Sequence, residues 1–374
     1  YINLIISLVV VSLIFLWAGS IDNNKIDEKD LKSKIGQMLI VGFRGLEIDS
    51  ESSIAQAIKD LNLGGVILFD YDVPSEGKIK RNIADPEQTK QLISNLKLIS
   101  PTLFVAVDAE GGLINRLKDK YGFTNIPSAQ DMGAENPSQT KEHALFLGNQ
   151  LKELGFNVNF APVVDVNINT ENPVIGGLKR SFGEDAETVT IHASNFISGL
   201  NENNIITAIK HFPGHGSSKD DSHLGLVDIT NTYQEEELIP YKKLISAGYN
   251  DMIMTAHVIN TNIDANYPAT MSPNFLQDIL RKDLEFKGVI VSDDMQMGAI
   301  TEHFGFEEAI IKSVNAGCDL LIISNNSSTY NEDDYYRAVE TIFNAVVAGE
   351  INIETINNSY DRITKLKKRY NLIE

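Results

Sequence analysis

The sequence predicts an α/β protein whose fold is a single (β/α)8 barrel of the TIM type, preceded by an apolar N-terminal segment. Three observations lead to this prediction. Eight short apolar runs recur along the chain, and a longer amphipathic segment follows each of them. The runs are continuously apolar, which is typical of parallel strands that are buried on both faces. The chain has 374 residues and a hydrophobic content of 43%, which is enough for one barrel of about 250 residues with insertions.

The eight apolar runs are the predicted barrel strands, and the segments between them carry helix signals. The runs cover residues 36–43, 65–69, 103–107, 158–166, 206–210, 252–257, 288–292 and 319–324. Proline-containing starts open three of the helices, at Asp85-Pro86, with Asp85 as the cap, at Asn136-Pro137 and at Ser272-Pro273. An open doubly wound sheet is the alternative, but the first run is followed by Phe43-Arg44-Gly45-Leu46 instead of the Gly-x-Gly-x-x-Gly turn of that fold.

The N-terminal segment is read separately from the barrel. Residues 2–18 are almost wholly apolar, and the first charged residue is Asp22. This length suits an export signal or a short membrane anchor, and Ala18-Gly19-Ser20 offers small residues where a signal peptidase cuts. A buried core helix is the alternative. We expect residues 1–20 to be a signal peptide or membrane anchor and residues 21–374 to be the barrel domain. The protein is then exported: secreted, periplasmic, or attached to the outer face of the cytoplasmic membrane through residues 2–18.

Charge and cysteine content exclude several classes of protein. Lys+Arg number 32 and Asp+Glu number 51, a formal net charge of −19, so nucleic acid is repelled. The single cysteine, Cys318, excludes an intramolecular disulfide and a cysteine-based metal site, and its apolar neighbours predict a buried structural thiol. The cluster Lys365, Lys367, Lys368 and Arg369 near the C-terminus is expected to be the solvated face of a basic helix.

Polar side chains gather at the ends of the predicted strands, where the active sites of (β/α)8 barrels lie. They include Asp108 and Glu110 after the third run, Asp165 in the fourth, Lys210 and His211 at the fifth, His257 in the sixth, Asp293 and Asp294 after the seventh, and Asn325 and Asn326 after the eighth. Ionisable groups at buried positions must be desolvated or paired, so their convergence indicates a polar catalytic pocket.

One strand end opens into a loop with three histidines, Lys210-His211-Phe212-Pro213-Gly214-His215-Gly216, followed by Asp221-Ser222-His223. The glycines predict a tight, exposed loop. A metal site is one interpretation, but the spacing matches neither His-Glu-x-x-His nor His-x-His, so we expect no metal. In extended backbone Asp221 and His223 point the same way, and a carboxylate beside an imidazole makes it an acid/base near neutral pH. A surface ion pair is the alternative for these two residues.

A second segment, Val289-Ile290-Val291-Ser292-Asp293-Asp294, ends a buried strand with two adjacent carboxylates. Neighbouring residues of a strand cannot face the pocket in the same way. One carboxylate is therefore expected to be a nucleophile while the other pairs with a neighbour. We assign the nucleophile to Asp293, which lies nearer the strand.

Taken together, these motifs resemble glycoside hydrolase family 3, in its bacterial β-N-acetylhexosaminidase branch. The resemblance runs from about Lys34 to Tyr370. It rests on the two segments above and on three others: Asp108-Ala109-Glu110-Gly111-Gly112 with Arg116, residues 160–166, and Arg180-Ser181-Phe182-Gly183. It implies a retaining, exo-acting enzyme that releases terminal N-acetylglucosamine (GlcNAc) from a small glycan, either a peptidoglycan fragment or a chitooligosaccharide. We expect it to be a monomer without a cofactor.

The resemblance also implies a role for each site residue. Asp293 would form the glycosyl-enzyme, and His223, paired with Asp221, would be the acid/base. The hydroxyls of the non-reducing sugar would be held by Asp108, Arg116, Arg180, Lys210 and His211. Glycosidases usually employ two carboxylates, so a His/Asp pair departs from the common pattern.

Rival functions remain open on the same scaffold. One is a β-glucosidase, and another is a phosphorylase that passes GlcNAc to phosphate, because a neutral histidine repels an anionic acceptor less than a carboxylate does. A rival of a different class is a non-catalytic glycan-binding barrel at the cell surface. The presence of Asp293, Asp221 and His223 together argues against that rival.

Overall fold

The computed structural model of the protein describes residues 27–221 and 225–374. The chain divides into two units, residues 1–31 and 32–374. Of the first unit only residues 27–31 are described, at the start of helix α2 (Glu28–Gln37), where the backbone N of Asp30 donates to Asp27 Oδ1 at 3.1 Å. The predicted export segment, residues 1–20, lies outside the described residues. Within the described ranges, no helix has both the length and the apolar character needed to cross a membrane.

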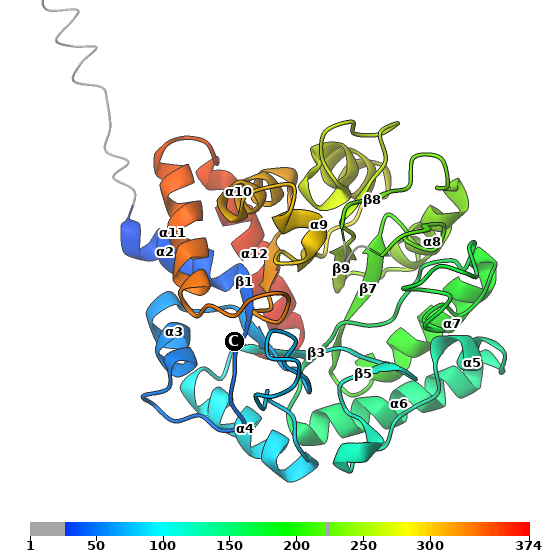
Figure 1. Ribbon diagram of the computed structural model, residues 1–374, viewed down its shortest axis with the longest axis horizontal. Helices are drawn as coiled ribbons and strands as arrows, with labels where there is room; N and C mark the ends of the chain where they lie inside the picture. The colour runs from blue at the N-terminus through cyan, green and yellow to red at the C-terminus, as the bar shows by residue number, and fades with distance from the viewer. Residues whose placement is uncertain (1–26, 222–224) are drawn as a thin grey trace, which may run out of the picture. The chain divides into compact units, whose positions relative to one another are not determined.

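The second unit is a closed barrel of eight parallel strands, as the sequence predicts (Figure 1). In order around the barrel the strands are β1 (Leu39–Gly42), β12 (Leu320–Ile323), β11 (Val289–Asp294), β9 (Met252–Thr255), β7 (Ile206–Phe212), β6 (Val158–Asn159), β3 (Phe104–Val107) and β2 (Gly65–Ile67). Strand β1 pairs with both β12 and β2, so the first and last strands close the sheet. All residues of these strands are buried except the last two of β11, which explains the continuously apolar runs.

Helices surround the barrel (Figure 1). The longer ones are α3 (Ser53–Leu61), α4 (Pro86–Ile99), α6 (Pro137–Leu154), α7 (Ala186–Asn201), α8 (Ile239–Ser246), η4 (Asn274–Asp283), α10 (Phe306–Ala316), α11 (Asp333–Val347) and α12 (Ile353–Arg369). Short helices stand in the connections: η1 (Asp119–Tyr121), α5 (Ala129–Gly133), η2 (Glu235–Leu238), η3 (Ala269–Met271) and α9 (Gly298–Thr301). Two small sheets pair β4 (Ala109–Gly111) with β5 (Ile114–Asn115) and β8 (Val227–Asp228) with β10 (Val258–Ile259).

Local sequence accounts for where several helices begin and end. Asp85 caps α4 by accepting a hydrogen bond from the backbone N of Gln88 at 2.9 Å, with proline at the first helical position. Asn136 caps α6 in the same way, and Gly155 ends that helix with a φ of 97°. These are the positions at which a side-chain oxygen and a left-handed glycine satisfy the unpaired backbone groups of a helix end.

Two predicted strand boundaries differ from the structure. Residues 36 and 37 belong to helix α2 and not to the first strand. The run 158–166 forms a ladder only over its first two residues, because Pro162 has no N–H to donate. The backbone N of Ala161 turns back to Asn159 O at 2.8 Å, and Val163 keeps only an isolated bridge to Lys210.

Two predictions about burial have opposite outcomes. Cys318 is a buried thiol, as expected. Lys367 is buried as well, so the prediction of a solvated face on α12 is wrong for this residue. Its flexible stem carries Nζ to Gln37 Oε1 at 2.7 Å and to Gly64 O at 3.1 Å, near the amino-terminal ends of the strands. Burial lowers the pKa of Lys367 to about 7.

Candidate active site

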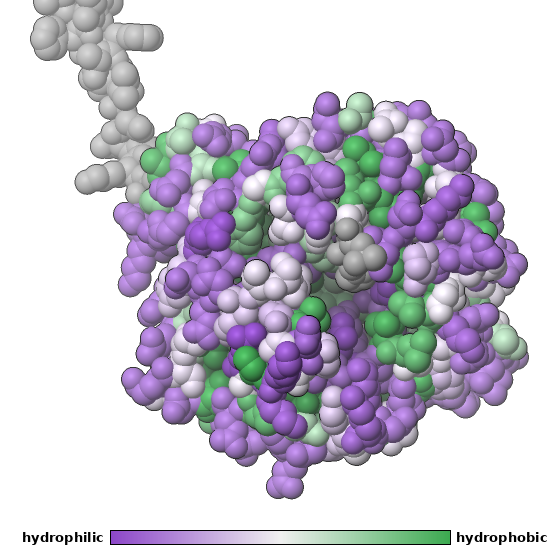
Figure 2. All heavy atoms as spheres, viewed as in Figure 1, coloured by the Kyte–Doolittle hydropathy of each residue, from purple (hydrophilic) through white to green (hydrophobic). Residues whose placement is uncertain are grey.

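A pocket of about 540 Å³ opens at the carboxyl ends of the barrel strands, and Figure 2 shows this face hollowed near its centre. Parallel strands of a barrel all end at the same rim, so residues that are far apart in the sequence meet there. The pocket lining includes every predicted sugar-binding residue and the predicted nucleophile: Asp108, Arg116, Arg180, Lys210, His211 and Asp293.

The two carboxylates that end β11 have different surroundings. Asp294 Oδ2 accepts a hydrogen bond from Ser324 Oγ, and Oδ1 accepts from the backbone N of Ser324 at 3.1 Å and of Gln296 at 3.2 Å. Burial raises the pKa of Asp294 to about 6. Asp293 lies half-buried at the pocket wall, where its Oδ1 accepts from the backbone N of Asp294 at 2.8 Å. Asp294 is thus held by Ser324, which follows β12, and by the backbone of the loop that follows β11.

A cluster of two carboxylates and two cations lines the same pocket. Lys210 Nζ lies 2.9 Å from Asp108 Oδ1 and 2.7 Å from Glu110 Oε1. Arg180 donates two hydrogen bonds to Glu110, both at 2.8 Å. Burial alone would raise the pKa of Glu110, but the charges of Arg180 and Lys210 outweigh it and hold that pKa well below its usual range. Glu110 therefore stays ionised, and the cluster around it offers charge-assisted hydrogen bonds to a polar ligand.

Arg116 adds a third cation, supported by a buried carboxylate. Its Nη2 lies 3.6 Å from Asp108 Oδ2, and its Nη1 lies 3.9 Å from Asp70 Oδ1. Lys118 Nζ donates to Asp70 Oδ2 at 2.6 Å, and the Arg116 guanidinium lies 5.4 Å from the centroid of the Phe69 ring. Asp70 and Phe69 therefore limit the orientations that the Arg116 side chain can take.

His211 is oriented by Asp165, a fully buried carboxylate. The imidazole Nδ1 donates to Asp165 Oδ2 at 2.7 Å, and Arg180 Nη2 donates to Nε2 at 3.2 Å. Asp165 Oδ1 also accepts from the backbone N of His211 at 3.2 Å and of His215 at 2.9 Å. Burial would raise the pKa of Asp165, but its interactions with His211 and His215 and the hydrogen bonds that it accepts lower it overall. The Asp165 carboxylate thus fixes both the orientation of the His211 imidazole and the backbone between His211 and His215.

The loop after β7 is buried, so the prediction of an exposed loop is wrong. Residues 211–218 are all buried. A Cβ on Gly216 would lie 1.7 Å from Val166 O, and Glu237 Oε2 accepts from the backbone N of Gly216 at 2.9 Å and of Ser217 at 3.2 Å. The glycines here permit close backbone packing. Burial also lowers the pKa of His215 to about 4, which keeps this imidazole neutral. Among the residues that the structure describes, no three His, Cys, Asp or Glu side chains are grouped to hold a metal ion.

The predicted acid/base falls in a part of the chain that is not described. His223 lies outside the described residues, together with positions 222 and 224, whereas Asp221 is described and half-buried. The backbone that leads to them is anchored as far as Ser218, whose carbonyl accepts from Asn169 Nδ2 at 2.7 Å and whose Oγ accepts from Asn172 Nδ2 at 2.9 Å. The pairing of His223 with Asp221 stays a prediction.

Sequence reasoning missed some residues of this site and, for others that it had named at strand ends, the role that they have. Glu110 stands two positions after Asp108, and the strand alternation that puts both on one side was a usable signal. Asp165 was noticed as a strand end, but its role in orienting His211 was not foreseen. The pocket lining also includes Tyr71, Val73, Ser327 and Ser328, which stand in none of the motifs described above.

Glu110→Ala is expected to lower the free energy of unfolding by about 3–5 kcal/mol, because it leaves Arg180 and Lys210 buried without their shared carboxylate. Urea unfolding measures the loss. Since the folded-state pKa of Glu110 is depressed, its contribution is present above the ordinary value of 4.5 and is lost as the pH falls through the lower folded-state value. In the control Glu307→Ala, removal of an exposed partner of Arg337 should cost less than about 1 kcal/mol. An equally small loss in Glu110→Ala would contradict the account of the cluster.

A polar pocket of paired carboxylates and cations at the carboxyl end of a (β/α)8 barrel is typical of the active sites of enzymes with the TIM-barrel fold. The family described as "Glycosyl hydrolase family 3 N terminal domain" matches residues 30–366. The chain belongs to glycosyl hydrolase family 3. This confirms the resemblance found in the sequence and the predicted class of enzyme, a glycoside hydrolase.

Individual relatives agree with this assignment. A β-hexosaminidase A of Pseudoalteromonas piscicida is 32% identical over 337 residues, which cover 84% of this chain and 55% of the relative. This chain thus spans little more than half the length of that protein. A β-hexosaminidase of Shewanella frigidimarina is 36% identical over 303 residues, 78% of this chain and 83% of the relative.

Solved structures show the same barrel. A family 3 β-N-acetylglucosaminidase from Paenibacillus sp. superposes with a TM-score of 0.82 at 33% identity, over 91% of this chain and 63% of that one. A β-N-acetylhexosaminidase from Beutenbergia cavernae has a TM-score of 0.80 at 28% identity, over 90% of this chain and 98% of that one.

Proposed function

We propose that the protein is a retaining, exo-acting β-N-acetylhexosaminidase that releases terminal GlcNAc. The observation that carries this proposal is that Asp293 lines the same pocket as the charged cluster around Glu110. Such a cluster suits a ring that carries many hydroxyls, since each charged group strengthens a hydrogen bond. The names of the relatives support the choice of sugar, because they are β-hexosaminidases and β-N-acetylglucosaminidases.

In the proposed mechanism Asp293 attacks the anomeric carbon of the terminal sugar. The bond from that carbon to the leaving oxygen breaks as the bond to the carboxylate forms, and His223 gives its proton to the leaving oxygen. The imidazole then takes a proton from water, whose oxygen attacks the same carbon and frees Asp293. Two inversions retain the β configuration. Asp221 orients His223 and stabilises its protonated form.

The hydroxyls of the terminal sugar are held, in this proposal, by Asp108, Arg116, Arg180, Lys210 and His211. These side chains are already fixed by one another and by Glu110 and Asp165. Groups held in place before the substrate arrives lose little freedom when it binds, which favours catalysis. Peptidoglycan fragments and chitooligosaccharides both present a terminal GlcNAc and are the proposed natural substrates.

Paired aryl β-glycosides of GlcNAc and of glucose test the proposed specificity. We expect kcat/KM for the GlcNAc glycoside to exceed that for the glucoside by about 10²-fold or more, because a site built around the acetamido group leaves polar atoms unpaired without it. The reverse preference would make the protein a β-glucosidase. Formation of GlcNAc 1-phosphate in phosphate buffer would make it a phosphorylase. Absence of any turnover would support a glycan-binding barrel.

A further inference from the structure

The connection between β2 and α4, residues 68–85, forms one wall of the pocket. It is much longer than the roughly 2–6 residues usual between a strand and a helix, and loops of this length often have a function. Tyr71 and Val73 of this connection line the pocket, beside Asn326, Ser327 and Ser328 of the loop after β12. None of these residues is among those proposed to hold the terminal sugar, so this wall is available for another part of the substrate.

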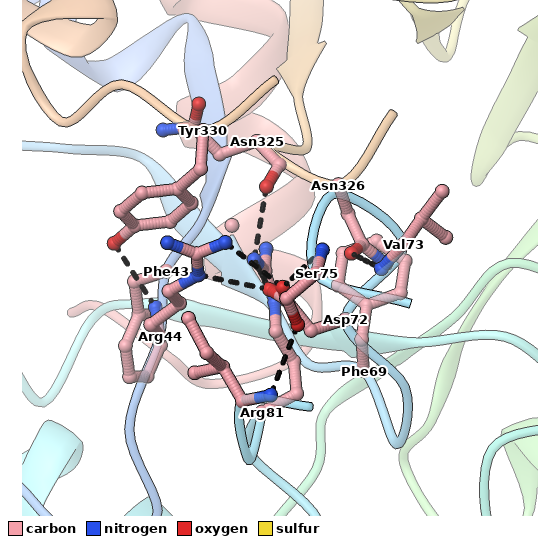
Figure 3. Close-up of polar contacts among 12 residues, drawn as sticks. Phe43, Arg44, Phe69, Asp72, Val73, Ser75, Arg81, Asn325, Asn326 and Tyr330 are labelled. Carbon is pink, nitrogen blue, oxygen red and sulfur yellow. Dashed lines mark hydrogen bonds and ion pairs between the residues drawn. The ribbon is translucent and has the colours of Figure 1, made fainter. Parts of the chain in front are cut away.

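A buried charge network holds the wall in place (Figure 3). Asp72 lies between two arginines: Arg44 donates to its two oxygens at 3.0 and 2.8 Å, and Arg81 Nη1 donates to Oδ1 at 3.0 Å. The Asp72 and Arg81 side chains have no exposed surface. Arg81 also donates to the carbonyl oxygens of Ser324 at 2.7 Å and Asn325 at 2.9 Å. The network therefore joins the connection after β2 to the loop after β12.

Asn326 fixes the pocket-lining residues on both sides of Asp72. Its Oδ1 accepts from the backbone N of Val73 at 3.0 Å (Figure 3), and its Nδ2 donates to Tyr71 O at 3.1 Å. Gly77, with a φ of 76°, passes so close to Tyr71 that a Cβ there would lie 2.5 Å from a ring atom. One side of the Tyr71 ring thus packs against Gly77 of the same loop, while 45% of the surface of Tyr71 stays exposed to solvent.

We propose that Tyr71, with Asn326, Ser327 and Ser328 beside it, is the subsite for the sugar ring of the leaving group. A pyranose ring has an apolar C–H face that packs on an aromatic ring, and a rim of hydroxyls that bond to amide and hydroxyl groups. Both kinds of surface are present on this wall. The pocket of about 540 Å³ falls within the range of about 300–1,000 Å³ that holds drug-sized ligands, so a second ring has room beside the first. The inference rests on the proposed function and specifies a carbohydrate leaving group.

Tyr71→Ala tests the subsite with two substrates that share the terminal sugar. N,N′-diacetylchitobiose has a sugar as leaving group, whereas β-GlcNAc fluoride releases only fluoride. We expect kcat/KM for the disaccharide to fall about tenfold, the size of one aromatic contact, while that for the fluoride stays within about twofold. Tyr71→Phe should keep most activity on both. Asn326→Ala removes a side chain of the subsite and also the hydrogen bonds that hold Tyr71 and Val73. It should therefore lower the ratio of disaccharide to fluoride activity as well.

The matched control is Tyr336→Ala, an exposed tyrosine of α11 that is not part of the pocket lining. This substitution should leave kcat/KM unchanged for both substrates. Equal losses on both substrates in Tyr71→Ala, or no loss on either, would overturn the subsite while leaving the proposed function in place. Failure of the wild-type protein to hydrolyse β-GlcNAc fluoride would instead overturn the proposed function and the subsite with it.

Discussion

Asp293→Ala is expected to lower kcat on an aryl β-GlcNAc glycoside by at least about 10⁴-fold, because the variant lacks the group that forms the bond to the anomeric carbon. The adjacent Asp294 is not a substitute, since Ser324 and Gln296 hold its carboxylate. The fold should survive, as Asp293 lies at the pocket wall and not in the apolar core. Long incubations at high enzyme concentration measure the residual rate, and thermal unfolding checks the fold.

Azide distinguishes a nucleophile from a carboxylate that merely holds the sugar. In Asp293→Ala a small anion has room to displace the aryl group, so azide should restore turnover and yield the α-glycosyl azide. Asp294→Asn is the matched variant. It changes a carboxyl whose pKa burial raises to about 6, and azide should not rescue it. A rate for Asp293→Ala above about a tenth of wild type would contradict the assignment, since loss of a nucleophile costs many powers of ten.

His223→Ala is expected to slow cleavage of diacetylchitobiose by about 10²–10⁴-fold, the usual contribution of general acid catalysis. A sugar alkoxide is a poor leaving group and needs a proton as the bond breaks, whereas a dinitrophenolate does not. Formation of the glycosyl-enzyme from the dinitrophenyl glycoside should therefore be nearly unchanged. The burst of dinitrophenolate before steady state measures that step separately from hydrolysis of the intermediate.

Asp221→Asn is the companion variant for the same mechanism. It leaves the imidazole of His223 in place but less basic and less well oriented, so the same pattern should appear in a milder form. Equal slowing of both substrates in the first step by His223→Ala would show that this residue holds the loop or the sugar, and would overturn its role as acid/base.

The barrel is predictable from the sequence because its strands are buried on both faces, which leaves eight local runs of apolar residues. Helix starts are equally local, as Asp85 and Asn136 show by capping the helices they precede. Two predictions failed for different reasons: the extent of β6 is limited by a local proline, whereas the burial of Lys367 depends on tertiary contacts. The ladder of β6 stops before Pro162, and the stem of Lys367 reaches past the surface of α12 to Gln37, which is distant in the sequence.

The site was predictable to the extent that its residues stand in short motifs. Asp108, Arg180, Lys210 and Asp293 were found this way, and the structure places them around one pocket. The wall that carries Tyr71 was not, because its support depends on pairs of distant residues. Arg81 and the carbonyl of Asn325 are 244 positions apart, and no local pattern in either segment predicts that they are in contact.

That separation has a consequence for the newly made chain. Arg81 leaves the ribosome 244 residues before Asn325, which at about 5–20 residues per second is a delay of roughly 12 to 50 s. Through this interval the guanidinium lacks the two carbonyl acceptors that hold it in the finished barrel, and the connection that carries Tyr71 has no β12 loop to pack against. Closure of the barrel and completion of the wall that carries Tyr71 are therefore one late event of biosynthesis, and a nascent chain that ends before β12 has neither.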